Sequence, residues 1–305
     1  MGLKVTLRNR IEFALLWLLV RTLGLMPRAS ARWLGARVGA LAYHVLGRLR
    51  RVGLRNLALA YPTWEAARRE QVLQIAYRNL GWLLAEFCLM GRYTAEDAGK
   101  FIVYDGLQHY LQARARGKGV LIVTGHLGAW ELSSFYHSMV GYPMGMVIRR
   151  LDNPLVDAFV NRTRCQHGNR VIHKDDFARG LISSMRSGET VGILMDTNMT
   201  PPQGVFVPFF GVPACTASGL ARIALKTDCA VLPGFLVWDE ADSRYVLRFG
   251  AALELIRTGD AEADAVANTA QFTAAIEAAI RQNPEQWLWM HRRWKTRPAG
   301  EQGVY

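Results

Sequence analysis

VLIVTGHLGAWE, residues 120–131, is the stretch of sequence that decides the fold. Residues 120–124 are apolar and rich in valine and isoleucine, as expected of a buried strand. Gly125 and Gly128 allow a tight turn, and a helix is expected to begin near Ala129. A strand that leads through a turn into a helix is the unit of open α/β sheets, whose sites form at the carboxyl ends of the strands.

The same alternation continues on both sides of this stretch. Strands are expected at residues 120–124, 144–148, 190–195, 231–237 and 245–249, where short runs rich in valine and isoleucine occur. Helices are expected at residues 65–91, 129–140, 154–167, 175–187, 216–227 and about 261–282. The pattern predicts an α/β fold with a mostly parallel central sheet flanked by helices. We expect one α/β domain over residues 61–305, preceded by a helical region over residues 1–60.

Residues 1–60 are both basic and apolar. They contain eleven lysines and arginines and a single acidic residue, Glu12, whereas the net charge of the whole chain is +12. Leucine and tryptophan lie between these cations, which suits helices on an anionic membrane surface, where each cation contributes about 1 kcal/mol. Binding to nucleic acid would explain the arginines but not the apolar residues among them. The alternative is an ordinary helical cap with a solvated basic face.

The apolar run at residues 13–20 is bounded by Glu12 and Arg21. Eight residues fall short of the ~20 that a bilayer-crossing helix needs. A tilted span over residues 11–27 stays open, because Arg21 could extend its charge to the interface. We predict membrane-associating helices that dock on the surface. No small-residue cleavage site clearly follows the run, so it is not interpreted as a removed signal peptide.

His126 and Glu131 are the candidate catalytic pair. His126 lies in the turn, and Glu131 lies about one helical turn into the following helix. A carboxylate there can accept a hydrogen bond from one imidazole nitrogen and leave the other nitrogen as a general base. Such a base can deprotonate a hydroxyl or amine that attacks a thioester, which is typically worth ~10²–10⁴ in rate. A turn histidine without a catalytic role is the alternative.

Other kinds of site lack their motifs in this sequence. The histidines form no cluster with ligand spacing and no His-Glu-x-x-His occurs, so no metal site is expected. The four cysteines contain no Cys-x-x-Cys pair, which indicates neither zinc nor a disulfide framework and fits reduced thiols facing the cytoplasm. The Gly-x-Ser-x-Gly elbow of serine hydrolases and the phosphate-binding loop of nucleotide enzymes are also absent.

Seven blocks of sequence, in this order, resemble the bacterial lipid A biosynthesis acyltransferases, which are late-acting enzymes of the lysophospholipid acyltransferase superfamily. The blocks span essentially the whole chain and are GHLGAWE (125–131), VIRRLDNP (147–154), Arg164-x-x-x-Gly168, MDTN (195–198), GVFVPFFGVPACT (204–216), VLPGF (231–235) and WLWMHRRWKTRPAGE (287–301). The resemblance implies an enzyme on the cytoplasmic face of the inner membrane that needs no metal or other cofactor. Its implied reaction moves a fatty acyl chain from acyl carrier protein or acyl-CoA to a membrane glycolipid or phospholipid-like acceptor.

The resemblance also implies roles for single residues. His126 matches the catalytic base of the family, and Glu131 matches its acidic partner. Arg164 matches a required arginine, and Arg149 falls in the block that resembles an acceptor-binding motif. Asp196 matches an aspartate after a strand, which could order an arginine or the base, or cap a helix.

Arg149 and Arg164 could together hold a phosphate or carboxylate of the acceptor or carrier. The alternative for both is ordinary surface ion pairing, for example with Asp152 or Asp157. Thr197 departs from the family pattern, in which glutamine usually follows the aspartate. The acceptor is therefore left open between lipid A precursors, other glycolipids and aminolipids.

The C-terminal block places Trp287, Trp289 and Trp294 beside Arg292, Arg293 and Lys295. This composition suits a headgroup-level interface or a docking patch for an acidic carrier protein. Tryptophans in the core with solvated cations are the alternative. Two rival functions also stay open for the whole chain, namely a non-catalytic membrane lipid-binding protein and a lipid hydrolase.

Overall fold

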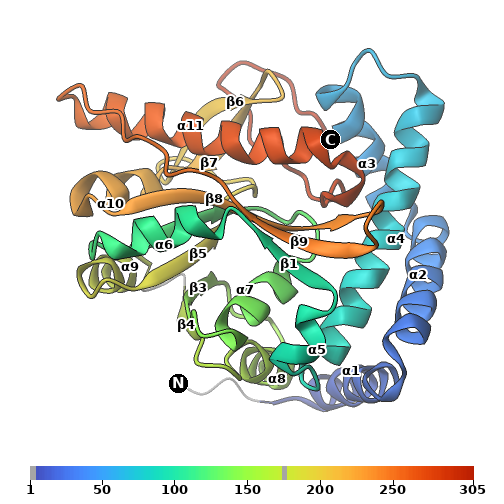
Figure 1. Cartoon of the computed structure of the whole chain (residues 1–305). Helices are drawn as coiled ribbons and strands as arrows, with labels where there is room; N and C mark the ends of the chain where they lie inside the picture. The colour runs from blue at the N-terminus through green and yellow to red at the C-terminus, as the bar shows by residue number, and fades with distance from the viewer. Residues whose placement is uncertain (1–4, 174–176) are drawn as a thin grey trace.

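A seven-stranded sheet forms the centre of the computed structural model, which describes residues 5–173 and 177–305 (Figure 1). The strand order is β1-β9-β8-β2-β5-β3-β4, and all neighbours are parallel except β8 and β9. The strands are β1 (Ile102–Asp105), β2 (Val120–Thr124), β3 (Gly145–Ile148), β4 (Arg170–His173), β5 (Thr190–Leu194), β8 (Ala230–Asp239) and β9 (Arg244–Phe249). The predicted α/β fold with a mostly parallel sheet is confirmed.

The five strands expected from the sequence are all present, with ends within two residues of those expected. The sequence analysis missed β1 and β4, which form the two edges of the sheet. Each has only four residues and carries polar side chains, Asp105 in β1 and Arg170 in β4. Short edge strands bury less apolar surface than central ones, so their signal in the sequence is weak.

The central strand β2 is apolar throughout because both of its faces are covered. Leu121 and Val123 belong to a core cluster that includes Ile276 of a C-terminal helix. Val120 and Ile122 point to the opposite cluster, which contains side chains of the helix that follows β2. Strands buried on both faces are continuous apolar runs rather than alternating ones. The apolar run in β2 therefore places its carboxyl end in the middle of the sheet.

The helices surround this sheet (Figure 1). They are α1 (Leu7–Leu25), α2 (Arg28–Val45), α3 (Gly47–Ala60), α4 (Ala66–Met90), α5 (Ala95–Gly99), α6 (Leu107–Ala115), α7 (Trp130–Met139), α8 (Pro154–Arg164), α9 (Phe177–Arg186), α10 (Gly219–Thr227), α11 (Ala261–Gln282) and the 3-10 turn η2 (Pro284–Gln286).

All six expected helices are present, with some differences at their ends. The helix expected at 154–167 ends at Arg164, and the one expected to start at 216 starts at Gly219. Thr216 and Ala217 instead belong to β7 (Val212–Ala217), which forms an antiparallel pair with β6 (Gly204–Phe209). The first two residues of the helix expected at 175–187 lie outside the described residues.

The N-terminal helices pack tightly on the α/β unit. Gly35 of α2 and Gly81 of α4 face each other so closely that a Cβ on Gly81 would lie 1.9 Å from the Gly35 carbonyl oxygen. Deeper in the same contact, the fully buried carboxylate of Glu86 receives Arg28 at 2.7 Å and Arg32 at 3.7 Å. Two of the N-terminal arginines are therefore paired with one buried carboxylate, which offsets one of their two charges, and they do not belong to a solvated basic face.

The outer surface of α1 and α2 is apolar. Leu7, Leu15 and Leu25 of α1 are 74%, 65% and 73% exposed, and Trp33 of α2 is 61% exposed. Exposed arginines lie between these side chains, at positions 8, 10, 21 and 37. Among the residues that the structure describes, no helix is both long and apolar enough to cross a membrane. The expected basic and apolar N-terminal helices are thus present, with much of their apolar surface open to the outside.

The tryptophans of the C-terminal segment lie in the core. Trp287, Trp289 and Trp294 are at most 1% exposed, so the interface is wrong for them and the alternative of tryptophans in the core is confirmed. Arg293 is also fully buried, and its guanidinium donates to the carbonyl oxygen of Cys215 at 2.9 Å. The alternative of solvated cations is therefore wrong for Arg293. This segment connects the β6–β7 pair with the end of the central strand.

Candidate active site

His126 lies in the turn between β2 and α7, at the carboxyl end of the central strand. Its carbonyl oxygen accepts a hydrogen bond from the Leu288 N–H at 3.0 Å, and the Gly128 N–H donates to the Gln286 carbonyl at 2.9 Å. Gly128 has a φ of +63°, and a Cβ there would lie 2.0 Å from the Leu236 carbonyl oxygen. Only glycine fits this position. The C-terminal segment thus fixes the backbone of the histidine turn.

Asp196 is the carboxylate that orients His126. β5 pairs with β2 in parallel, so Asp196, just after β5, reaches the histidine turn. The imidazole Nδ1 lies 2.8 Å from Oδ1 of Asp196, and the His126 N–H donates to Oδ2 at 2.7 Å. The indole N–H of Trp287 also donates to Oδ2, at 2.7 Å. Because an ionised carboxylate only accepts hydrogen bonds, Nδ1 carries the proton and Nε2 is left as the basic nitrogen.

Gly125 makes room for this carboxylate. A Cβ at Gly125 would lie 3.0 Å from Oδ2 of Asp196 and 3.2 Å from Ile276. Any larger residue would therefore press on the carboxylate, whose Oδ2 already accepts two hydrogen bonds. The glycine next to the histidine serves close packing here rather than an unusual backbone angle.

The charges of Asp196 and His126 shift the pKa of each other. Burial by itself would raise the pKa of Asp196, but the charge of His126 and the three hydrogen bonds lower it to about 2. Burial by itself would lower the pKa of His126, but the charge and hydrogen bond of Asp196, with the charge of Glu131, raise it above its ordinary value. The side chain of His126 is 22% exposed and that of Asp196 only 2%. The imidazole of His126 is therefore partly open to solvent, whereas the carboxylate of Asp196 is sealed from it.

Glu131 does not receive the ring hydrogen bond that we expected from the sequence. Its two carboxylate oxygens are bound by the guanidinium of Arg164, with Nε donating to Oε2 at 2.8 Å and Nη2 donating to Oε1. Both side chains are largely buried. The prediction of a His126–Glu131 hydrogen bond is corrected because Asp196 takes the position at Nδ1, while Glu131, in the first turn of α7, reaches Arg164 at the end of α8. Glu131 acts on His126 through its charge.

Arg149 lies apart from this pair. Its side chain is 79% exposed and its Nη2 donates to Asp152 at 3.1 Å. The surface ion pair with Asp152, expected as the alternative, is therefore present. Arg164 lines a pocket whose lining does not include Arg149, so the structure does not bring the two arginines together around one site. A role of Arg149 in acceptor binding stays a prediction.

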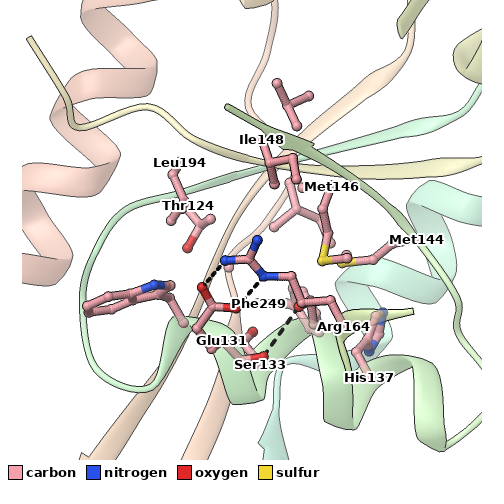
Figure 2. Close-up of a pocket in the computed structure, with 16 residues that line it drawn as sticks. Thr124, Glu131, Ser133, His137, Met144, Met146, Ile148, Arg164, Leu194 and Phe249 are labelled. Carbon is pink, nitrogen blue, oxygen red and sulfur yellow. Dashed lines mark hydrogen bonds and ion pairs between the residues drawn. The ribbon is translucent and has the colours of Figure 1, made fainter. Parts of the chain in front are cut away.

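An apolar pocket lies between the sheet and α7, with the Glu131–Arg164 pair in its wall (Figure 2). Its cavity volume is about 80 Å³, and about 650 Å³ of empty space is counted when the open solvent at the pocket is included. Trp130 lines this pocket and also meets the His126 ring edge-on, with the ring centres 5.2 Å apart. The pocket therefore begins next to His126. Its apolar lining includes Ile122, Met144, Met146, Ile148, Leu194 and Phe249.

The sequence analysis missed two side chains of this region. Trp287 binds Asp196, and no local motif links residues that lie so far apart in the chain. His137 lines the pocket (Figure 2), and its Nδ1 is 2.8 Å from the hydroxyl of Tyr104. Burial, assisted by the charge of Arg114, lowers the pKa of His137 to about 3, so this ring is neutral. A single histidine within a helix gives no signal of this placement.

A family model of bacterial lipid A biosynthesis acyltransferases matches residues 4–296 of the chain. The chain belongs to this family. The predicted family and the predicted enzyme class are both confirmed: the protein is a lipid A biosynthesis acyltransferase.

Curated relatives match this lipid A biosynthesis acyltransferase over nearly its whole length. It is 29% identical to the lipid A biosynthesis palmitoleoyltransferase of Escherichia coli K12, over 95% of this chain and 92% of the relative. It is 28% identical to the lauroyltransferase of the same organism, over 97% and 94% of the two chains. The myristoyltransferase of that organism is 24% identical, over 87% and 81%.

Three of the sequence blocks that resemble the family meet in this candidate site. GHLGAWE supplies His126, MDTN supplies Asp196, and the C-terminal block supplies Trp287. Arg164, from a fourth block, binds Glu131 of the first. Among the described residues, no group of three or more His, Cys, Asp or Glu side chains is arranged to hold a metal ion. The four cysteines are free thiols, three of them buried.

Proposed function

We propose that this acyltransferase moves a fatty acyl chain from an acyl thioester to a hydroxyl of a lipid A precursor. The thioester would be carried by acyl carrier protein or by coenzyme A. The observation that carries the proposal is the His126–Asp196 pair beside Trp130, which lines an apolar pocket. The relatives named for transfer of palmitoleoyl, lauroyl and myristoyl groups in lipid A biosynthesis support this acceptor. Thr197 and Asn198 follow Asp196, whereas glutamine usually follows this aspartate in the family. Other glycolipids and aminolipids therefore stay alternative acceptors.

In the proposed reaction, Nε2 of His126 takes the proton of the acceptor hydroxyl as its oxygen attacks the thioester carbonyl. The new carbon–oxygen bond forms, the carbon–sulfur bond breaks, and His126 returns the proton to the departing thiolate. Asp196 holds the ring in the tautomer that this sequence needs and stabilises the imidazolium that forms. No covalent acyl-enzyme is required.

Arg164 is the group in the pocket that suits developing negative charge. Its guanidinium is held in a fixed direction by Glu131, and fixed donors stabilise an oxyanion without reorganising during the reaction. The same cation could instead bind a phosphate of the acceptor. The apolar lining around Met144, Met146 and Leu194 is a suitable environment for the acyl chain. In this proposal Glu131 is a positioning residue rather than the direct partner of the base.

We also propose that the enzyme works on the cytoplasmic face of the inner membrane, with α1–α3 against the lipid. These helices combine exposed leucines with exposed arginines, including Leu15, Leu18, Arg10 and Arg21. Apolar side chains enter the headgroup boundary, and cations are attracted to anionic lipid. This face would bring the pocket mouth to acceptors that never leave the bilayer.

The decisive experiment incubates purified protein with labelled acyl carrier protein or acyl-CoA and a lipid A precursor in vesicles. Wild type is compared with His126→Ala and with the control His109→Ala, which changes a half-buried histidine of α6 outside the pocket. We expect label in a new lipid band, about 10²–10⁴-fold slower in His126→Ala and unchanged in His109→Ala.

Two other results would overturn the proposal. Free fatty acid released at the full rate without an acceptor would show a lipid hydrolase. If wild type transfers label no faster than His126→Ala with either donor and several acceptor lipids, the protein would instead be a non-catalytic lipid-binding protein.

A further inference from the structure

The side chain of Asn153 forms hydrogen bonds with both α8 and α1. Its side chain caps α8, because Oδ1 accepts from the Leu155 N–H at 3.1 Å and from the Val156 N–H at 3.5 Å. The amide nitrogen of the same side chain donates to α1, to the Asn9 carbonyl at 2.9 Å and to Oε2 of Glu12 at 3.1 Å. The residue is only 8% exposed. One amide group thus fixes the start of α8 to the membrane-facing helix.

Glu12, the single acidic residue among the first sixty, is one of the acceptors of this link. Hydrogen bonds from Arg8, at 2.6 Å, and from Asn153 lower its pKa, so it is ionised at neutral pH. Phe13 of α1 adds an apolar contact, with its ring edge-on to that of Phe159 of α8 and the ring centres 6.0 Å apart. The two helices also lie side by side in Figure 1. Glu12 is therefore explained within its basic segment by its role as an acceptor for Asn153 and Arg8.

α8 depends on these contacts because the core holds it weakly. None of its residues, Pro154–Arg164, is fully buried. Its far end is held by Arg164, whose guanidinium binds Glu131 and whose carbonyl oxygen accepts from Asn169 at 3.1 Å. A helix with little buried apolar surface is held in place by its end contacts and opens at low free-energy cost. The position of Arg164 in the pocket thus depends on how firmly α1 holds the other end.

We propose that Asn153 and Glu12 form a latch through which docking of α1 on an anionic bilayer fixes α8 and, with it, Arg164 in the pocket. A lipid surface that covers the exposed apolar side of α1 holds α1 in place. Because Asn153 ties α8 to α1, the same surface favours the ordered state of α8. Leu7, Ile11, Leu15 and Leu18 lie on that exposed side, with Arg10 and Arg21 for the anionic headgroups. The inference rests on the proposed function. Asn153 is a positioning residue that acts through Arg164.

Asn153→Asp tests the latch without removing the cap. Aspartate caps helices as well as asparagine does, but it has no N–H to donate and would repel Glu12. The matched control is Asp260→Asn, the converse exchange at the N-cap of α11, where Oδ1 accepts from Glu262 and Ala263. Glu12→Ala is a second variant, on a half-exposed side chain whose loss leaves the core intact.

Two readouts are compared in vesicles containing anionic lipid and in micelles of a neutral detergent. The first is kcat for acyl transfer, and the second is hydrogen–deuterium exchange of the amides of α8. We expect wild type and Asp260→Asn to gain kcat and protection of α8 on vesicles. Asn153→Asp should lose both gains, with a kcat on vesicles roughly 10-fold below wild type. It should still sediment with vesicles, because the exposed side of α1 is unchanged, and Glu12→Ala should show a smaller loss.

The latch is wrong if α8 gains the same protection on vesicles in Asn153→Asp as in wild type, or if that variant keeps the full rise in kcat. A merely structural role would lower kcat equally in vesicles and micelles, which would also overturn it. If wild type transfers no acyl chain in either medium, the proposed function fails, and the exchange of α8 still decides on the latch.

Discussion

Asp196 accepts three hydrogen bonds from three directions, two of them from His126 and one from Trp287. A buried carboxylate with this many donors keeps its charge, which is why its pKa falls to about 2 in spite of burial. The charge in turn holds the imidazole in one tautomer and raises the pKa of His126. In the proposed mechanism, the basicity and the orientation of His126 thus both come from Asp196.

Asp196→Asn should lower kcat by about 10²–10⁴-fold, because the neutral amide no longer fixes the tautomer or stabilises the imidazolium. The pH profile should change as well. Activity needs neutral His126, so kcat/KM rises with pH through the pKa of this residue, which Asp196 raises. Removing the charge lowers that pKa, and the midpoint of the rise should move to lower pH. A midpoint that stays in place in the variant would contradict the assigned role of Asp196.

Glu131 and Arg164 should behave as one unit, because each is the main partner of the other in the pocket. Glu131→Gln and Arg164→Gln should each lower kcat/KM, by about 10²–10³-fold if the guanidinium holds the oxyanion. The double variant should lose little more than the worse single one, since the pair is already broken. The double-mutant cycle measures this, and losses that multiply would show that the two residues act separately.

At the scale of elements, the crossing of α2 and α4 sets how closely the N-terminal helices approach the α/β unit. Gly35, Gly39 and Gly81 have no side chain at the contact, and a Cβ on each would lie within 2.2 Å of a backbone oxygen of the other helix. Backbone cannot give way as a flexible side chain can. A side chain added at any of these three glycines would therefore force α2 and α4 apart.

Gly81→Ala should therefore lower the free energy of unfolding, by about 1–3 kcal/mol or more. The control is Gly99→Ala at the end of α5, where an added Cβ would meet nothing within 4 Å. That variant should be neutral or slightly more stable, since alanine loses less conformational freedom in a helix than glycine does. Urea unfolding of both variants gives the comparison, and equal stabilities would contradict the close contact.

In the central sheet, the strands that were predicted from the sequence have more buried residues than the two that were missed. β2 and α4 have long apolar patterns because the core covers them, whereas β1 and β4 are short edge strands with polar residues. In the site, His126 and the glycines around it were visible because they are local in sequence. The Asp196 partnership was only one of several possibilities, because it depends on β5 lying next to β2. Parallel neighbours need not be consecutive in the chain, so sheet order cannot be read from local pattern.

The structure of the whole molecule separates the N-terminal cations into two groups. Arg28 and Arg32 neutralise Glu86 inside the protein, whereas Arg10, Arg21 and Arg37 remain on the surface. The surface charge that can meet a membrane is thus smaller than composition suggests. In the proposed docking on a membrane, apolar contact from α1 then supplies a substantial part of the binding free energy.

Leu15→Glu should weaken binding to anionic vesicles and leave the melting temperature unchanged, because Leu15 is 65% exposed on α1. Leu111→Glu, at an exposed leucine of α6, is the control and should bind as wild type does. Binding of wild type should also decrease as salt rises, since ions screen the attraction of the exposed arginines. Vesicle sedimentation measures both effects, and equal binding of the two variants would exclude α1 as the docking helix.

The hydrogen bonds from Trp287 to Asp196 and from the Leu288 N–H to His126 have a consequence for biosynthesis. A ribosome makes His126 long before it makes Trp287, on the order of 10 s earlier at usual rates of translation. During that interval the nascent chain lacks the hydrogen bond from Trp287 to Asp196 and the hydrogen bond from the Leu288 N–H to the His126 carbonyl oxygen. Catalytic competence is therefore acquired late in synthesis, so an incomplete polypeptide that has already reached the bilayer would not yet consume acyl donors.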